Sequence, residues 1–125
     1  MGSGITQACA VAGLDVVMMD ISEAQVQRGL ATITGSMDRL IKREKMSEAE
    51  KAATLGRIQT ATALQSLAGC DLVIEAASEN IDLKLKVFAD LDAILGPDAI
   101  IASNTSSISI TLLAAGTKRP EQVIG

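Results

Sequence analysis

Short apolar runs alternate along the chain with longer segments in which apolar residues recur at helical spacing. The runs at residues 15–19, 71–76 and 99–102 are continuous enough to predict buried strands. Apolar positions three and four residues apart predict helices over residues 22–42 and 81–95. Strands that alternate with helices in this way favour an α/β fold with a parallel sheet.

Capping signals mark where several of these helices begin and end. Ser22 with Gln25, and Ser47 with Glu50, form the Ser-x-x-Gln/Glu pattern of a capping box, and the second one predicts a helix to about residue 58. Gly13 suits the end of a small-residue helix. The remaining predicted elements are a helix at 2–12, an edge strand at 60–63, a helix at 109–115 and a strand opening at 122–125.

These elements predict a Rossmann-like, doubly wound parallel sheet. The length of 125 residues suits one domain, residues 1–125. The chain opens on a predicted helix, whereas a sheet of this class normally opens on a strand. We therefore expect an incomplete domain that lacks its first strand. Neighbouring strands would lose ladder partners, and we expect such a chain to oligomerise, borrow a strand or aggregate.

Composition excludes several classes of function. The net charge is −4 and the basic residues are scattered, which argues against a nucleic-acid surface. No apolar run reaches the roughly 20 residues of a membrane span, and no signal peptide is evident. Two cysteines without metal spacing, Cys9 and Cys70, favour a cytoplasmic protein with no metal site. Histidine is absent, which removes the commonest general base from this chain.

Gly2 and Asp20 are candidates for binding a dinucleotide. Gly2 opens the first predicted helix, where the last glycine of a G-x-G-x-x-G turn would stand. Asp20 ends a predicted strand at about the spacing expected for the acid that binds the adenosine ribose, which favours NAD over NADP. A plain helix start and an ordinary acid ahead of the Ser22 cap remain the alternatives.

Two loops beyond the carboxyl ends of predicted strands are further candidates, because ligands of open α/β sheets bind there. After residues 71–76, small residues such as Ala76 allow close approach of a flat ring, while Glu79 and Lys84 could orient cofactor groups. Residues 103–107 offer several hydroxyl and amide donors for a substrate oxygen. Solvated or capping helix starts are the alternative for both loops.

Taken together, the sequence resembles the L-3-hydroxyacyl-CoA dehydrogenase family, including the bacterial 3-hydroxybutyryl-CoA dehydrogenases. The similarity runs in order over essentially the whole chain, and the Ser-Asn-Thr-Ser-Ser stretch after a strand is its most specific part. The matching stretches are residues 1–5, 15–20, 71–76, 102–107 and 118–121.

The resemblance implies an oxidoreductase that uses NAD to interconvert 3-hydroxyacyl-CoA and 3-oxoacyl-CoA in fatty-acid metabolism, as a homodimer when full length. It implies that Asp20 binds the adenosine ribose and that Glu79 and Lys84 lie on the nicotinamide side of the cofactor.

The resemblance also implies residues for the substrate. Ser106 matches the family's serine that contacts the 3-hydroxyl or 3-oxo group, and Asn104 lies beside it. Ser36 and Arg43, on the long predicted helix, fall near positions that contact the CoA portion, and the basic Arg43 suits a CoA phosphate.

The sequence departs from the family pattern at both ends. The first two fingerprint glycines, the catalytic histidine with its partner glutamate, and the helical C-terminal domain are all absent from these 125 residues. We therefore expect the chain alone to show no dehydrogenase turnover. A non-catalytic relative on the same scaffold, or another NAD-linked hydroxy-acid dehydrogenase, remains an alternative, and the preferred acyl chain length is open.

Overall fold

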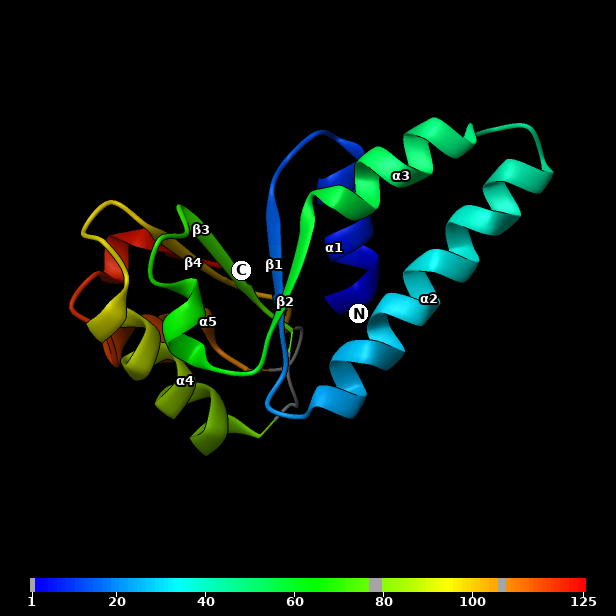
Figure 1. Cartoon of the computed structure of the whole chain (residues 1–125). Helices are drawn as coiled ribbons and strands as arrows, with labels where there is room; N and C mark the ends of the chain where they lie inside the picture. Colours follow the sequence, from blue (N-terminus) through cyan, green and yellow to red (C-terminus); the bar gives the residue numbers. More distant parts are fainter. Residues whose placement is uncertain (1, 77–79, 106–107) are drawn as a thin grey trace. The chain divides into compact units, whose positions relative to one another are not determined.

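The computed structural model describes residues 2–76, 80–105 and 108–125 (Figure 1). The chain divides into two compact units, Met1–Ala63 and Leu64–Gly125. We call them the amino-terminal and the carboxyl-terminal unit. Each unit contains its own parallel sheet, as an α/β fold requires.

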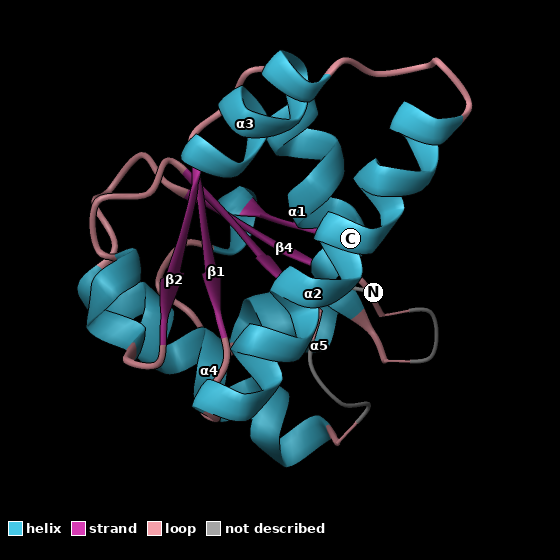
Figure 2. Cartoon of the chain, turned by 45° about the vertical axis from the view of Figure 1, so that its right-hand side comes forward, coloured by secondary structure: helices cyan, strands magenta, loops and turns pink. Residues whose placement is uncertain are grey.

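The amino-terminal unit pairs two parallel strands and surrounds them with helices. The two strands pair along their full length, from Val16 opposite Ile58 to Met19 opposite Ala61. Figure 2 shows these two strands side by side. The first helix of the unit, α1, packs against its other two helices, α2 and α3. The elements are α1 (Gly2–Val11), β1 (Val16–Met19), α2 (Glu23–Lys42), α3 (Glu48–Gly56) and β2 (Ile58–Ala61).

Local sequence signals account for most boundaries in this unit. Gly13 takes a φ of 99° after α1, a left-handed conformation that favours glycine. The side chains of Ser22 and Ser47 cap α2 and α3 as predicted. The predicted end of the second capped helix at about residue 58 is wrong. Helix α3 ends at Gly56, because Ile58 is already paired with β1.

The core of the amino-terminal unit is built from the apolar stripe of α2. Val26, Ile33 and Met37 follow each other at helical spacing, and each is almost completely buried. They pack with Met18 from β1 and Met46 from the segment before α3. The stripe therefore holds the long helix against the sheet.

The carboxyl-terminal unit contains a three-stranded parallel sheet of order β3-β4-β5. Strand order follows the chain, and the two crossovers run through α4 and α5. The elements are η1 (Leu64–Leu67), β3 (Leu72–Glu75), α4 (Ile81–Ile94), β4 (Ile100–Ser103), α5 (Ile110–Ala115), η2 (Pro120–Gln122) and β5 (Val123–Ile124). None of the helices in the described part of either unit combines the length and apolar character of a bilayer span.

Only one face of this second sheet is buried within the described chain. Val73, Ile101 and Val123 stand in one row of the register and are buried. Leu72 and Ile124, which point to the other face, are exposed. Because the strand order is sequential and parallel crossovers are right-handed, α4 and α5 lie over the same face. The sequence predicted buried strands, and the structure buries alternate residues of each of them.

The buried side of α4 also differs from the prediction. Apolar spacing predicts that one face of α4 carries Leu83, Val87, Leu91 and Ile94. The structure buries Leu91 as expected, but it also buries Lys84 and Phe88, while Leu83 is 44% exposed. Both sets satisfy helical periodicity, so the pattern alone did not separate them. A lysine is accepted on the inner face because its charge is matched there by an acid.

Arg119 joins the end of α4 to the segments that precede β4 and β5. It is 8% exposed, and its Nε donates to Asp92 Oδ1 at 2.6 Å. Its two terminal nitrogens donate to the main-chain oxygens of Asp92, Leu95, Gly96 and Ala99. Helix α4 has no basic residue in its own last turn, so Arg119 supplies the positive charge that a helix carboxyl end favours.

Candidate functional site

Asp20 lies at the carboxyl end of β1, as the sequence predicted. Its main-chain N–H donates to Ala61 O at 3.2 Å, which ties its backbone to β2. Its Oδ1 accepts the N–H of Ser22 at 3.2 Å, and the residue is exposed. In a full capping box Gln25 would take that N–H, but Gln25 Oε1 instead accepts from Arg28. The carboxylate is thus oriented beside the start of α2, where helix polarity favours a negative charge.

Gly2 is the first residue of α1, so it stands at a helix amino end as predicted. A Cβ atom added to Gly4, two residues further along α1, would meet no atom of another part of the chain within 4 Å. The side of α1 that Gly4 faces is therefore open. Unpaired N–H groups of a first helical turn attract phosphate and other anions. The binding of a pyrophosphate at this end of the helix stays a prediction.

A buried polar network joins the carboxyl ends of β3 and β4. Glu75 and Ser103 are the last residues of their strands and lie opposite each other in the register. Lys84 Nζ, from α4, lies 2.6 Å from Glu75 Oε1, and the Ser103 hydroxyl donates to the same oxygen at 2.9 Å. The side chains of Lys84 and Glu75 are only 1% and 3% exposed.

The electrostatics of this network depend on complete pairing. Removing an ion from water costs several kcal/mol in a protein interior, and only good geometry with further hydrogen bonds offsets that cost. Here one ammonium faces one carboxylate, and Ser103 adds a donor to the carboxylate. Among the described residues, no buried side-chain nitrogen or oxygen is without a hydrogen-bond partner. The network is therefore satisfied as it stands.

The network extends into the loop that follows β4. The N–H of Asn104 donates to Glu75 O at 2.9 Å. The N–H of Thr105 donates to Ser103 Oγ at 3.2 Å, and the N–H of Ile108 donates to Thr105 Oγ1 at 3.1 Å. Asn104 and Thr105 are thus tied to the strand ends, and Ile108 is tied to Thr105.

The predicted residues near this loop have different environments. Ala76 directly follows β3 and is half-buried, and Asn104 is exposed just beyond β4. Lys84 is close to both strand ends, but its ammonium contacts Glu75 and is shielded from solvent. Glu79 and Ser106 lie outside the described residues. The roles predicted for these five residues stay predictions.

Glu75 and Ser103 were missed as individual functional candidates by the sequence analysis. A usable signal was present, since Glu75 stands two residues after Val73 and so shares its inward direction. An acid on the buried face of a strand requires a partner. Lys84 is the first basic residue of the helix that follows this strand, so it was the cation nearest in sequence to Glu75.

Ser36 and Arg43 are the predicted CoA contacts. Ser36 lies within α2, and Arg43 lies at its carboxyl end. Ser36 is half-buried, and its Oγ accepts from Gln7 Nε2 at 3.1 Å. Arg43 is the exposed C-cap residue of α2. It follows Ser36 by seven residues, which correspond to about two helical turns. A hollow of about 380 Å³ adjoins Gln7. It is lined by Gly4, Gln7, Ala8, Val11, Leu40, Lys45, Met46 and Glu50.

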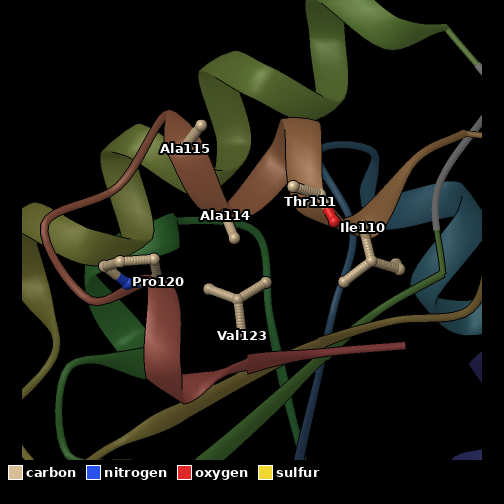
Figure 3. A pocket seen from close by; sticks show the side chains of 6 residues that line it. All are labelled: Ile110, Thr111, Ala114, Ala115, Pro120 and Val123. Atoms are coloured by element: carbon tan, nitrogen blue, oxygen red, sulfur yellow. The ribbon is translucent and has the colours of Figure 1, made fainter.

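A second hollow, of about 460 Å³, lies between α5, η2 and β5 (Figure 3). Its walls carry no ionisable side chain, so they provide no acid or base. The lining residues are Ile110, Thr111, Ala114, Ala115, Pro120 and Val123. In the described part of the chain, no group of histidine, cysteine, aspartate or glutamate side chains could hold a metal ion.

Comparison with known proteins identifies the family to which this arrangement belongs. The profile of the family described as "3-hydroxyacyl-CoA dehydrogenase, NAD binding domain" matches residues 1–125. The chain belongs to this family. The resemblance inferred from the sequence is thereby confirmed, and so is NAD as the cofactor of 3-hydroxyacyl-CoA dehydrogenases of this type.

Relatives within the 3-hydroxyacyl-CoA dehydrogenase group are similar over the whole chain. The 3-hydroxybutyryl-CoA dehydrogenase of Bradyrhizobium diazoefficiens is 50% identical over 125 residues, which are 100% of this chain and 43% of that protein. The fatty acid oxidation complex subunit alpha of Colwellia psychrerythraea is 38% identical over 100% of this chain and 17% of its own length.

Solved structures confirm the predicted Rossmann-like α/β fold. The crystal structure of (S)-3-hydroxybutyryl-CoA dehydrogenase from Ralstonia eutropha matches with a TM-score of 0.96 and 58% identity. The match covers 98% of this chain and 44% of that one. The chain thus spans less than half the length of these single-enzyme relatives.

Proposed function

We propose that this chain is the NAD-binding part of an oxidoreductase that interconverts a 3-hydroxyacyl-CoA and a 3-oxoacyl-CoA in fatty-acid metabolism. NAD accepts or supplies the hydride in this reaction. The observation that carries the proposal is the family match over residues 1–125. The position of Gly2 at the amino end of α1 and the oriented carboxylate of Asp20 support it, because a dinucleotide site uses a helix amino end and an acid after a strand.

For the cofactor, we propose that Gly2 and the first turn of α1 face the pyrophosphate. Asp20 accepts hydrogen bonds from the adenosine ribose, and its charge would repel the extra phosphate of NADP. Ala76 leaves room for the ring system, and Glu79 and Lys84 belong to the nicotinamide side. Because the Lys84 ammonium is buried against Glu75, Lys84 acts there through the network and not by direct solvent-exposed contact.

For the substrate, we propose that Ser106 and Asn104 orient the 3-oxygen of the acyl group. Ser36 and Arg43 contact the CoA portion. The exposure of Arg43 and its distance of about two turns from Ser36 support this assignment, since a CoA carries several phosphates along an extended molecule.

The organisation of the whole protein is also a proposal. Residues 1–125 form one NAD-binding domain, which works with a helical domain in a cytoplasmic homodimer. Neither Cys9 nor Cys70 forms a disulfide, which suits a reducing compartment. These 125 residues contain no histidine, so alone they lack the commonest base for taking the hydroxyl proton, and we expect no turnover from them alone.

The test is a steady-state assay of NADH oxidation by the full-length protein that contains this chain. We expect turnover with acetoacetyl-CoA, a preference for NADH over NADPH, and no comparable rate with free 3-oxo acids. The 125-residue chain is assayed in parallel as the expected inactive control. A faster reaction with free acids would favour another hydroxy-acid dehydrogenase, and no reaction with any of them would favour a non-catalytic relative.

A further inference from the structure

The described part of the carboxyl-terminal unit contains two buried ion pairs, one toward each end of α4. Lys84 pairs with Glu75 near the start of the helix, and Asp92 pairs with Arg119 near its end. The first pair lies at the carboxyl ends of β3 and β4, where ligands of an open parallel sheet bind. The second lies at the end of α4 that precedes β4. Two similar interactions in one unit thus differ in their distance from the candidate site.

The contacts of Ser103 show what the first pair controls. An ionised carboxylate only accepts hydrogen bonds, so the Ser103 hydroxyl proton points at Glu75 Oε1. The lone pairs of Ser103 Oγ are then turned away from Glu75, and one of them accepts the N–H of Thr105. Lys84 Nζ donates to the same Glu75 oxygen at 2.6 Å, so two donors converge on Oε1.

A second tie acts on the same loop. Glu75 accepts the N–H of Asn104 with its main-chain oxygen, while its side chain acts through Ser103 on Thr105. Glu75 therefore holds the N–H of Asn104 directly and acts on the N–H of Thr105 through Ser103.

We propose that Lys84, Glu75 and Ser103 are positioning residues, which hold the backbone of Asn104 and Thr105 so that the Asn104 side chain meets the substrate oxygen. This inference rests on the proposed function. A role in stability alone explains the network less well, because apolar residues of similar volume often stabilise a core as much as a buried ion pair does. The network instead supplies direction, which catalysis requires to a fraction of an ångström.

The test compares Ser103→Ala with Ser103→Thr in the full-length protein, with Asp92→Asn as the matched control. Ser103→Ala removes the link between Glu75 and Thr105, whereas threonine keeps the hydroxyl. Asp92→Asn weakens the other buried pair of the same unit without touching the loop. Glu75→Gln, which removes the charge at nearly constant shape, replaces Ser103→Ala if the alanine variant does not fold.

We expect Ser103→Ala to lower kcat for acetoacetyl-CoA reduction by about 10-fold or more, with KM for NADH changed by less than about 3-fold. Ser103→Thr should recover most of kcat. Asp92→Asn should lower the melting temperature but leave kcat within about 2-fold. Equal losses of kcat in the alanine and asparagine variants, or no recovery by threonine, would overturn the proposal.

A second measurement separates this proposal from the proposed function. Hydrogen exchange of the peptide that contains Asn104 and Thr105 should become faster in Ser103→Ala and stay unchanged in Asp92→Asn. Unchanged exchange in Ser103→Ala overturns the positioning role whatever the activity. The wild-type protein could show no turnover while hydrogen exchange of this peptide still becomes faster in Ser103→Ala. In that case the proposed function fails, but the role of Ser103 in holding Asn104 and Thr105 is supported.

Discussion

Replacing Arg119 by alanine should be among the most destabilising changes in the carboxyl-terminal unit. The guanidinium donates to Asp92 Oδ1 at 2.6 Å and to four main-chain oxygens around the end of α4. Removing one partner of a buried ion pair costs about 3–5 kcal/mol. The Asp92 side chain is 10% exposed and keeps the N–H of Lys118, so we expect about 3 kcal/mol, the lower end of that range.

The assay is urea unfolding of the chain followed by far-ultraviolet circular dichroism, since the sequence contains neither tryptophan nor tyrosine. A loss of about 3 kcal/mol corresponds to a midpoint lower by about 1–3 M at an m-value of about 1–3 kcal/mol/M. Arg119→Lys keeps the charge but fewer donors, so it should lose about 1–2 kcal/mol.

Lys86→Ala is the matched control for Arg119→Ala. Lys86 pairs with Asp90 on the same helix at 2.8 Å, but its side chain is 73% exposed. Exposed pairs of this spacing contribute only about 0.3–0.5 kcal/mol. If Arg119→Ala and Lys86→Ala shift the urea midpoint equally, burial does not determine the strength of the Arg119 contacts, and the reasoning fails.

Three further outcomes follow from single residues. Burial raises the pKa of Asp92, but hydrogen bonds from the Lys118 N–H and the Arg119 side chain, with their charges, outweigh it and lower the pKa. The contribution of Asp92 to stability is therefore present above the unfolded value of about 4 and is lost as pH falls through the lower folded pKa; urea midpoints of Asp92→Asn should lack that acid-side decline. Gly13→Ala should cost about 1 kcal/mol because of its φ of 99°, whereas Gly56→Ala, in a helix with open space beside it, should not lower the urea midpoint. Asp20→Ala should raise KM for NADH about 10-fold and reduce the preference over NADPH; an unchanged ratio of the two cofactors would remove Asp20 from the ribose site.

Features that depend on near neighbours in the chain were predicted well. The caps at Ser22 and Ser47 were correct because a helix start is satisfied by side chains within a few residues. The place of Asp20 at a strand end was correct for a similar reason. The end of α3 was misplaced because Ile58 pairs with Val16 of β1, more than 40 residues earlier in the chain. This strand pairing ends the helix, although helical periodicity would allow it to continue.

The polar network could not be predicted from spacing. Ser103 and Glu75 are 28 residues apart, and they meet only because β3 and β4 pair in a register that places both strand ends level. The inward face of α4 was misjudged for a related reason. A lysine favours solvent unless a carboxylate is already buried opposite it, and Glu75 is placed there by the sheet.

By itself, the sequence determined the order and type of the elements, the α/β class, the family and the candidate cofactor acid, because hydrophobic periodicity, caps and motifs act over short stretches of chain. Tertiary structure alone decided which side of α4 is buried, which sheet face is covered, and which charges meet. Those outcomes depend on strand register and on the pairing of ions away from water, and neither is a property of any one segment.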